Sequence, residues 1–221
     1  MAHKIFPVFI LFIIPFKILA FKLPSNEPSA RTIYTVDFFR LVQGTFELSR
    51  EKPFTKNRSL HIALLGTYAS TKGLAKPYLE AQDFSYTKSY TGIDQRSKEL
   101  RGGGVNIQVR NYLGKNPTLF EGFFLSSEFI ARYLFINSLV YDYELESERE
   151  LNSEMIQGYL GYNVGWQKIF RHVVSLDFHV GGGFWYSKYS NEKKPTKYQQ
   201  SYQLDYTGFF FNSGILVGII I

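Results

Sequence analysis

Apolar and polar residues alternate along segment after segment of this 221-residue chain, and this alternation restricts its fold more than any other feature. In "VNIQVR" (105–110), three apolar residues fall on one side of an extended strand, and two amides and an arginine fall on the other. "SLDFHVGGGFWYSKYS" (175–190) alternates in the same way around three glycines. No helical period is sustained over a dozen residues. Because successive side chains of a strand point to opposite faces, the pattern predicts an all-β protein.

The polar faces of these strands indicate what the apolar faces meet. A soluble barrel turns its apolar side chains inward, whereas an outer-membrane barrel turns them toward lipid and lines its lumen with polar residues. Solvated faces would be rich in Lys and Glu, but 105–110 and 157–165 carry mostly amides and glycines. Tyr162, Trp166 and Tyr186 lie near predicted strand ends, which is typical of interfacial aromatic girdles. We predict a membrane barrel, and a soluble periplasmic ligand-binding barrel is the alternative.

The number of alternating segments predicts an antiparallel up-and-down transmembrane β-barrel of eight strands. Both termini of such a barrel lie on the periplasmic side, which requires an even number of strands. Seven strands are clear, so one more must precede residue 43. The candidate is "RTIYTVD" (31–37), followed by a reversal within "FFRLVQ" that no Gly or Pro marks. The seven clear strands cover 43–52, 58–69, 101–113, 120–142, 154–169, 173–188 and 205–221.

Connections alternate in length, as expected if short turns lie at the periplasmic rim and longer loops lie outside. Short connections are predicted at 49–59, 114–119 and 170–172, and longer ones at 70–100, 144–153 and 191–204. Alternation from residue 120 runs for more residues than a membrane crossing needs. The surplus predicts a two-stranded ribbon that turns near Ser147–Arg149. We expect its four glutamates (Glu144, Glu146, Glu148 and Glu150) to be staggered, or relieved by nearby lysines.

The N-terminal segment "MAHKIFPVFILFIIPFKILA" (1–20) has the layout of a secretory signal peptide. Its apolar run is shorter than the roughly 20 residues that a spanning helix needs, although a retained membrane anchor remains the alternative. The predicted organisation is a signal peptide (1–20), a lead-in (21–30) and a barrel domain (31–221).

The chain resembles the small eight-stranded outer-membrane β-barrel proteins of Gram-negative bacteria, particularly those of unknown function. The resemblance rests on "GTFELSREKP" leading into "SLHIALLGTY", "GYNVGWQKIF" leading into "VSLDFHVGGGFWYS", and the closing "SGILVGIII". It implies a monomer in the bacterial outer membrane that contacts membrane lipid and lipopolysaccharide and is inserted by the barrel-assembly machinery. One departure is Ile221, which stands where such barrels usually end on an aromatic residue.

Charged residues on the inferred lumen face are the candidates for chemistry. They are Arg110, Glu128, Arg132, Asp177 and His179, with Glu47 and His61 nearby. An eight-stranded barrel is just wide enough for side chains to fill, so these groups are expected to pair as a structural plug. The alternative is a lipid-modifying enzyme, a hydrolase or acyltransferase, that uses Ser175, Asp177 and His179. Residues two apart on one strand stand about 6.6 Å apart, whereas a catalytic triad needs hydrogen bonds in series.

Composition removes several other function classes. The chain has no cysteine, which excludes disulfides, cysteine zinc sites and thiol catalysis. Its four histidines have no metal-site spacing, and its glycine triplets lack the Lys-Ser or Lys-Thr of a phosphate loop. The net charge of +6 comes without a nucleic-acid recognition motif. We therefore predict a non-enzymatic outer-membrane barrel with a structural or surface-interaction role and no cofactor, metal or nucleic-acid partner.

Overall fold

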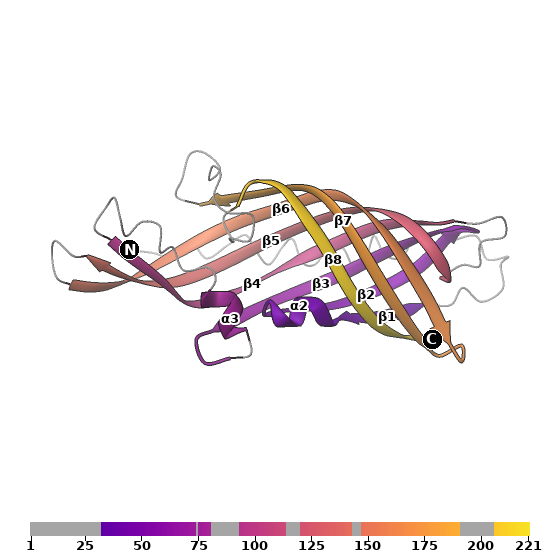
Figure 1. Cartoon of the computed structure of the whole chain (residues 1–221), viewed down its shortest axis with the longest axis horizontal. Coiled ribbons are helices and arrows are strands. Elements are labelled where there is room, and N and C mark those ends of the chain that lie inside the picture. The colour runs from indigo at the N-terminus through magenta and orange to yellow at the C-terminus, as the bar shows by residue number, and fades with distance from the viewer. Residues whose placement is uncertain (1–31, 74, 81–92, 114–119, 143–146, 191–205) are drawn as a thin grey trace, which may run out of the picture. The chain divides into compact units, whose positions relative to one another are not determined.

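Eight antiparallel strands close into a barrel in which each strand pairs with its neighbours in sequence and β8 returns to β1 (Figure 1). This confirms the predicted fold class. The computed structural model describes residues 32–73, 75–80, 93–113, 120–142, 147–190 and 206–221. The predicted signal peptide and lead-in lie outside the described residues. The strands are β1 (Ile33–Asp37), β2 (Thr45–Thr55), β3 (Arg58–Ser70), β4 (Ile93–Tyr112), β5 (Gly122–Asp142), β6 (Ser147–Phe170), β7 (Val174–Tyr189) and β8 (Gly208–Ile220).

The two faces of the barrel wall carry different side chains, as the alternation predicted. Along β7, Asp177 and His179 are buried in the lumen, whereas Phe178 and Val180 between and beyond them are exposed on the outside. The same division holds on the other strands. Large apolar and aromatic side chains are exposed on the outside, for example Phe211 at 77% and Leu160 at 64%.

The eighth strand is the short β1, and a one-turn helix, α2 (Phe38–Val42), makes the reversal that follows it. Tyr34 and Val36 point outward on β1, so a continued strand would also place Arg40 on the outside. The helix instead brings Asp37 and Arg40 onto one face, because residues three apart are neighbours on a helix. The Asp37 carboxylate caps the helix by accepting from the Phe39 and Arg40 amides at 2.8 and 3.2 Å. Arg40 is therefore buried.

Gly44 lies two residues beyond the end of α2, and its φ of +72° lies in the left-handed region. A Cβ there would stand 2.8 Å from the Tyr68 carbonyl oxygen and 2.9 Å from the Ala75 Cβ. We expect Gly44→Ala to lower the free energy of unfolding, measured by urea titration, by about 1–3 kcal/mol. Gly66→Ala is the matched control, because a Cβ at Gly66 meets nothing within 4 Å. Equal effects of the two substitutions would contradict this explanation of the turn.

The ribbon is formed by the ends of β5 and β6, which stay paired as far as Asp142 and Ser147. Strand β6 begins at Ser147, so the predicted turn position of Ser147–Arg149 is wrong: these residues are already paired with β5. Glu148 and Glu150 lie opposite Tyr141 and Leu139, so neither faces another glutamate. The predicted long connection 70–100 contains a second one-turn helix, α3 (Lys76–Glu80), and the beginning of β4.

Side chains of the lumen are arranged in layers, which the inward residues of β5 cross in order. Near the end of the barrel where β1 begins and β8 ends, which we call the terminal end, Phe124 belongs to an apolar layer. Next comes Glu128, in a charged layer, and then Ile130, in an aromatic layer with Leu65, Tyr159 and Trp185. Toward the ribbon end lies a further apolar layer. Its members are Ala69, Ala75, Leu79, Leu100, Leu134, Ile136 and Met155, so α3 packs against it through Leu79.

Candidate functional site

Buried charges gather in one layer of the lumen, which we call the ionic layer. Its members come from most of the elements of the barrel: Asp37, Arg40, Glu47, Glu51, His61, Arg110, Glu128, Asp177 and His179. They contain five carboxyl groups but only two guanidinium groups, so each arginine serves several acids. Desolvated charges of this kind are stable only when they are paired and hydrogen-bonded.

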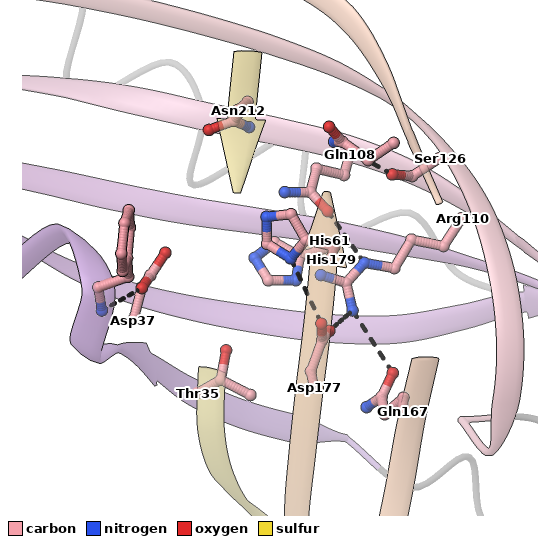
Figure 2. A network of polar contacts seen from close by, with 12 residues as sticks. Thr35, Asp37, His61, Gln108, Arg110, Ser126, Gln167, Asp177, His179 and Asn212 are labelled. Carbon is pink, nitrogen blue, oxygen red and sulfur yellow. Dashed lines mark hydrogen bonds and ion pairs between the residues drawn. The ribbon is translucent and has the colours of Figure 1, made fainter. Parts of the chain in front are cut away.

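Arg110 on β4 is the centre of the first cluster (Figure 2). Its Nη1 lies 3.1 Å from Glu51 Oε2 and 2.5 Å from Asp177 Oδ2, and all three side chains are almost completely buried. The guanidinium also stacks over the Phe124 ring, 4.6 Å from its centroid. Tyr112 Oη donates to Glu51 Oε1 at 2.7 Å, which satisfies the second oxygen of that carboxylate. Arg110 thus joins β2, β4 and β7 across the lumen.

Arg40 on α2 is the centre of the second cluster. Its Nε lies 2.9 Å from Glu47 Oε2 and 3.4 Å from Asp37 Oδ2, and its Nη2 lies 3.3 Å from Glu128 Oε1. His61 Nε2 is 3.7 Å from Glu47 Oε1. These contacts hold α2 against β2 and β5 from the inside of the barrel.

Gln108 connects the two clusters. Its Nε2 donates to Glu128 Oε1 at 3.1 Å, and its Oε1 accepts from Arg110 Nε at 3.0 Å. Asn163 and Asn212 also donate to Glu128, at 2.8 and 2.5 Å. The ionic layer is therefore one continuous network that includes neutral amides.

The five candidate residues from the sequence do not all meet. Arg110, Asp177 and His179 form one chain of contacts, and Glu128 joins them through Gln108. Arg132 lies apart, nearer the ribbon end, with its guanidinium 4.9 Å from the Trp185 ring centroid. Among the described residues, Arg132 has no ion pair.

Several members of the network were not predicted from the sequence, among them Asp37, Arg40, Glu51 and Tyr112. Asp37 and Arg40 could have been predicted, because an aspartate three residues before an arginine at a reversal is typical of a capped helical turn. The alternation places Glu51 and Tyr112 on the same faces as Glu47 and Arg110, but the contact between the two depends on the register of β2, β3 and β4.

Ser175, Asp177 and His179 share the lumen face of β7 but do not form a catalytic series. His179 Nδ1 lies 3.3 Å from Asp177 Oδ1, which is the base-to-acid half of a triad. Ser175 Oγ is buried and has no hydrogen-bond partner in the described part of the chain, and neither has His179 Nε2. Nucleophilic catalysis needs the hydrogen bond between hydroxyl and imidazole that is missing here. Asp177 is held instead by Arg110.

Apolar layers lie on both sides of the ionic layer. The layer at the terminal end consists of Ile33, Tyr112, Phe120 and Phe124, and the aromatic layer lies on the other side. Within the described residues, no group of three or more His, Asp or Glu side chains is placed to hold a metal ion. No described helix is long and apolar enough to cross a membrane.

A cavity of about 370 Å³ lies outside the lumen, at the base of the ribbon. Its lining includes Glu99, Arg101, Phe135, Asn137, Asn152 and Glu154. Arg101 lies 5.9 Å from the Phe135 ring centroid, Asn137 donates to Asn152 at 2.9 Å, and Tyr133 donates to Glu154 at 2.5 Å. These polar groups form an outward-facing border where the apolar outer surface ends.

An ion pair in the described part of the ribbon relieves some of its negative charge: Lys98 Nζ lies 2.8 Å from Glu150 Oε1. Donation from Lys98 holds the pKa of Glu150 below its usual value. Because the folded pKa is lowered, the pair stabilises the ribbon above the pKa of an unfolded-chain glutamate, and this is lost as the pH falls through the folded pKa. We expect the protection factors of the ribbon amides, which are corrected for the intrinsic exchange rate at each pH, to fall modestly at acidic pH, at high salt and in Lys98→Ala. If Lys98→Ala exchanged no faster than Lys76→Ala, a change in α3, the pair would not order the ribbon.

Comparisons with known proteins give one structural similarity. No family model matches the chain, and no curated protein matches it. A solved structure, the N-terminal β-barrel domain of OprF from Pseudomonas aeruginosa, is similar at 11% sequence identity and a TM-score of 0.37. The match covers 87% of this chain and 96% of that domain.

Proposed function

We propose that this protein is a non-enzymatic β-barrel of the bacterial outer membrane. Its lumen acts as a structural plug, and the parts beyond the membrane meet partners at the cell surface. The observation that carries the proposal is the arrangement of the wall: large apolar side chains cover the outside, and the charges are buried inside. A soluble barrel has the opposite arrangement.

The height of the apolar outer surface on β6 fits a lipid bilayer. Outward residues are apolar, aromatic or glycine from Ile156 to Trp166, and the next outward residues are charged: Glu154 on one side and Lys168 on the other. Eleven residues at about 3.3 Å each, tilted by about 45°, span about 25 Å, which is the height of the apolar band of an outer-membrane barrel. Trp166 and Tyr133 at its borders fit aromatic girdles.

The contents of the lumen favour a plug over a channel or an enzyme. Ionic, aromatic and apolar layers follow one another along the barrel, and eight strands leave room for side chains only. The lipid-modifying alternative requires a serine hydroxyl in contact with His179, whereas Ser175 Oγ has no hydrogen-bond partner among the described residues. Partners at the cell surface can therefore meet only the exterior beyond the apolar band, which comprises the ribbon, the cavity at its base and the connections at that end.

In this proposal the terminal end faces the periplasm and the ribbon faces outward. The surrounding partners are membrane lipid and lipopolysaccharide, and the barrel-assembly machinery inserts the chain as a monomer. The polar border at the ribbon base, with Arg101 and Glu154, lies at the height of the lipid headgroups.

Membrane fractionation of a Gram-negative host that expresses the full chain tests the proposal. We expect the protein in the outer-membrane fraction, resistant to extraction at high pH, and cut within the ribbon when protease is added to intact cells. N-terminal sequencing of the purified protein should begin near Phe21 if the predicted signal peptide is removed. Recovery as a soluble periplasmic protein would favour the ligand-binding barrel instead.

A further inference from the structure

The barrel wall has a seam between β8 and α2 in its ribbon-end half. β1 pairs with β8 only from Leu216 to Ile220, because β1 ends at Asp37. Beyond Leu216, β8 continues to Gly208 with β7 on one side. On the other side stands α2, which contacts both β8 and β2 (Figure 1). A one-turn helix therefore stands beside β8 where β1 would continue if it were longer.

The edge of β8 at this seam lacks a hydrogen-bonding strand. Thr32 and Ile221 exchange both backbone hydrogen bonds, so alternate residues of β8 from Ile221 onward direct their backbone groups toward β1. By that alternation Phe211, Ser213 and Ile215 face the seam. Within the described residues, no strand pairs with these three on the side away from β7. The side chain of Ser213 is also exposed on the outside.

Two lumen-facing side chains of β8 at the seam, Phe210 and Asn212, are less covered than their neighbours in the same layers. Asn163 on β6 and Asn212 on β8 both donate to Glu128 Oε2, yet Asn163 is buried and Asn212 is only half-buried. In the aromatic layer, Tyr159 and Trp185 are buried, whereas Phe210, 5.4 Å from Trp185 between ring centroids, is half-buried. Both half-buried residues belong to the segment of β8 that has no strand beside it.

We propose that this seam, between β8 residues 209–215 and α2, is a side opening in the wall where a membrane lipid lodges against Phe210 and Asn212. The inference rests on the proposed membrane function. A lipid is the expected occupant because the seam is continuous with the apolar outer surface that faces the membrane in this proposal. The exposed apolar residues that border the seam are Phe209, Phe211 and Ile215 on β8 and Phe38, Phe39, Leu41 and Val42 on α2. A lipid that covers the exposed apolar surface of β8 and α2 would therefore also contact the seam between them. Backbone groups and amides there can hydrogen-bond to the ester or amide linkages of a lipid, since bilayer hydrocarbon offers no partner.

Tryptophan quenching by chain-brominated phosphatidylcholine tests the seam. The background carries Trp166→Phe and Trp185→Phe, which remove both native tryptophans. Adding Phe210→Trp returns one tryptophan to the aromatic layer, so the total ring volume of that layer is nearly unchanged. Phe211→Trp is the outward control, and Tyr159→Trp is the inward control in an intact part of the wall. Each variant is reconstituted in vesicles of brominated or ordinary phosphatidylcholine after its β-sheet content has been verified by circular dichroism.

We expect strong quenching in Phe211→Trp, at least half as much in Phe210→Trp, and little in Tyr159→Trp. If Phe211→Trp were quenched while Phe210→Trp stayed as protected as Tyr159→Trp, the seam would be overturned and the membrane function left intact. Absence of quenching in Phe211→Trp would overturn both. Quenching in Phe210→Trp that disappears as the protein-to-lipid ratio rises would assign the seam to a second copy of the chain. If Phe210→Trp does not fold, bimane labels on Asn212→Cys and Asn163→Cys give the same comparison, with quenching expected only for Asn212→Cys.

Discussion

Replacing Arg110 with leucine is expected to lower the free energy of unfolding by about 3–5 kcal/mol, the largest effect of any single substitution proposed for this chain. Arg110 lies 3.1 Å from Glu51 Oε2 and 2.5 Å from Asp177 Oδ2, and each carboxylate is fully buried. Leucine would leave two carboxylates in the lumen without a cation. Urea titration of the barrel in phospholipid vesicles, followed by tryptophan fluorescence, measures the change.

Arg58→Leu is the control for this substitution, because Arg58 is exposed beside the turn between β2 and β3. It should change the free energy of unfolding by about 0.5 kcal/mol or less. A triple variant in which Arg110, Glu51 and Asp177 all become leucine should recover much of the lost stability, because no unpaired charge remains. An Arg110→Leu barrel as stable as the Arg58→Leu barrel would show that the ionic layer is open to water rather than packed.

Placing an arginine at Leu160 is expected to cost about 2–4 kcal/mol of unfolding free energy in a bilayer. Leu160 is 64% exposed and lies near the middle of the apolar stretch of β6. If that face meets hydrocarbon, the guanidinium must either lose its hydration or be accompanied by a water defect in the bilayer, and both are unfavourable.

The matched control is Leu151→Arg, on the same strand but in the ribbon beyond the apolar band, where Leu151 is already 40% exposed. It should cost about 0.5 kcal/mol or less. Equal small effects of the two arginines would mean that both leucines face water, which is the expectation for a soluble barrel.

The sequence predicted which side of each strand is buried because the side-chain period of a strand is two, whatever its partner is. That is why Asp177, His179 and Gln108 were placed on the lumen face before any pairing was known. Which of them touch was beyond the sequence, because contact across a barrel depends on eight registers at once. Arg132 and Glu128 are only two inward positions apart on β5, yet they lie in different layers.

The site around Arg40 shows where the alternation fails. A period of two carries Arg40 to the outside, next to Val36 and Phe38 in the pattern, and only a helical turn brings it into the lumen. The reversal within 38–43 was predicted, but the alternation did not show that it is a helical turn that places Arg40 in the lumen. The turn of the ribbon was misplaced for a simpler reason: residues on both sides of it are charged, so no change of pattern marked the reversal.

Spin-label accessibility on matched pairs of neighbours tests most directly whether the apolar outer face meets lipid. Single cysteines at Ile107, Leu160 and Phe178 would be compared with cysteines at Gln108, Asn163 and Asp177 in reconstituted protein. Labels at the first three should collide with oxygen, which concentrates in the bilayer, and be shielded from a water-soluble nickel chelate, whereas labels at the second three should be shielded from both. Free access of the chelate to Ile107, Leu160 and Phe178 would contradict a membrane barrel.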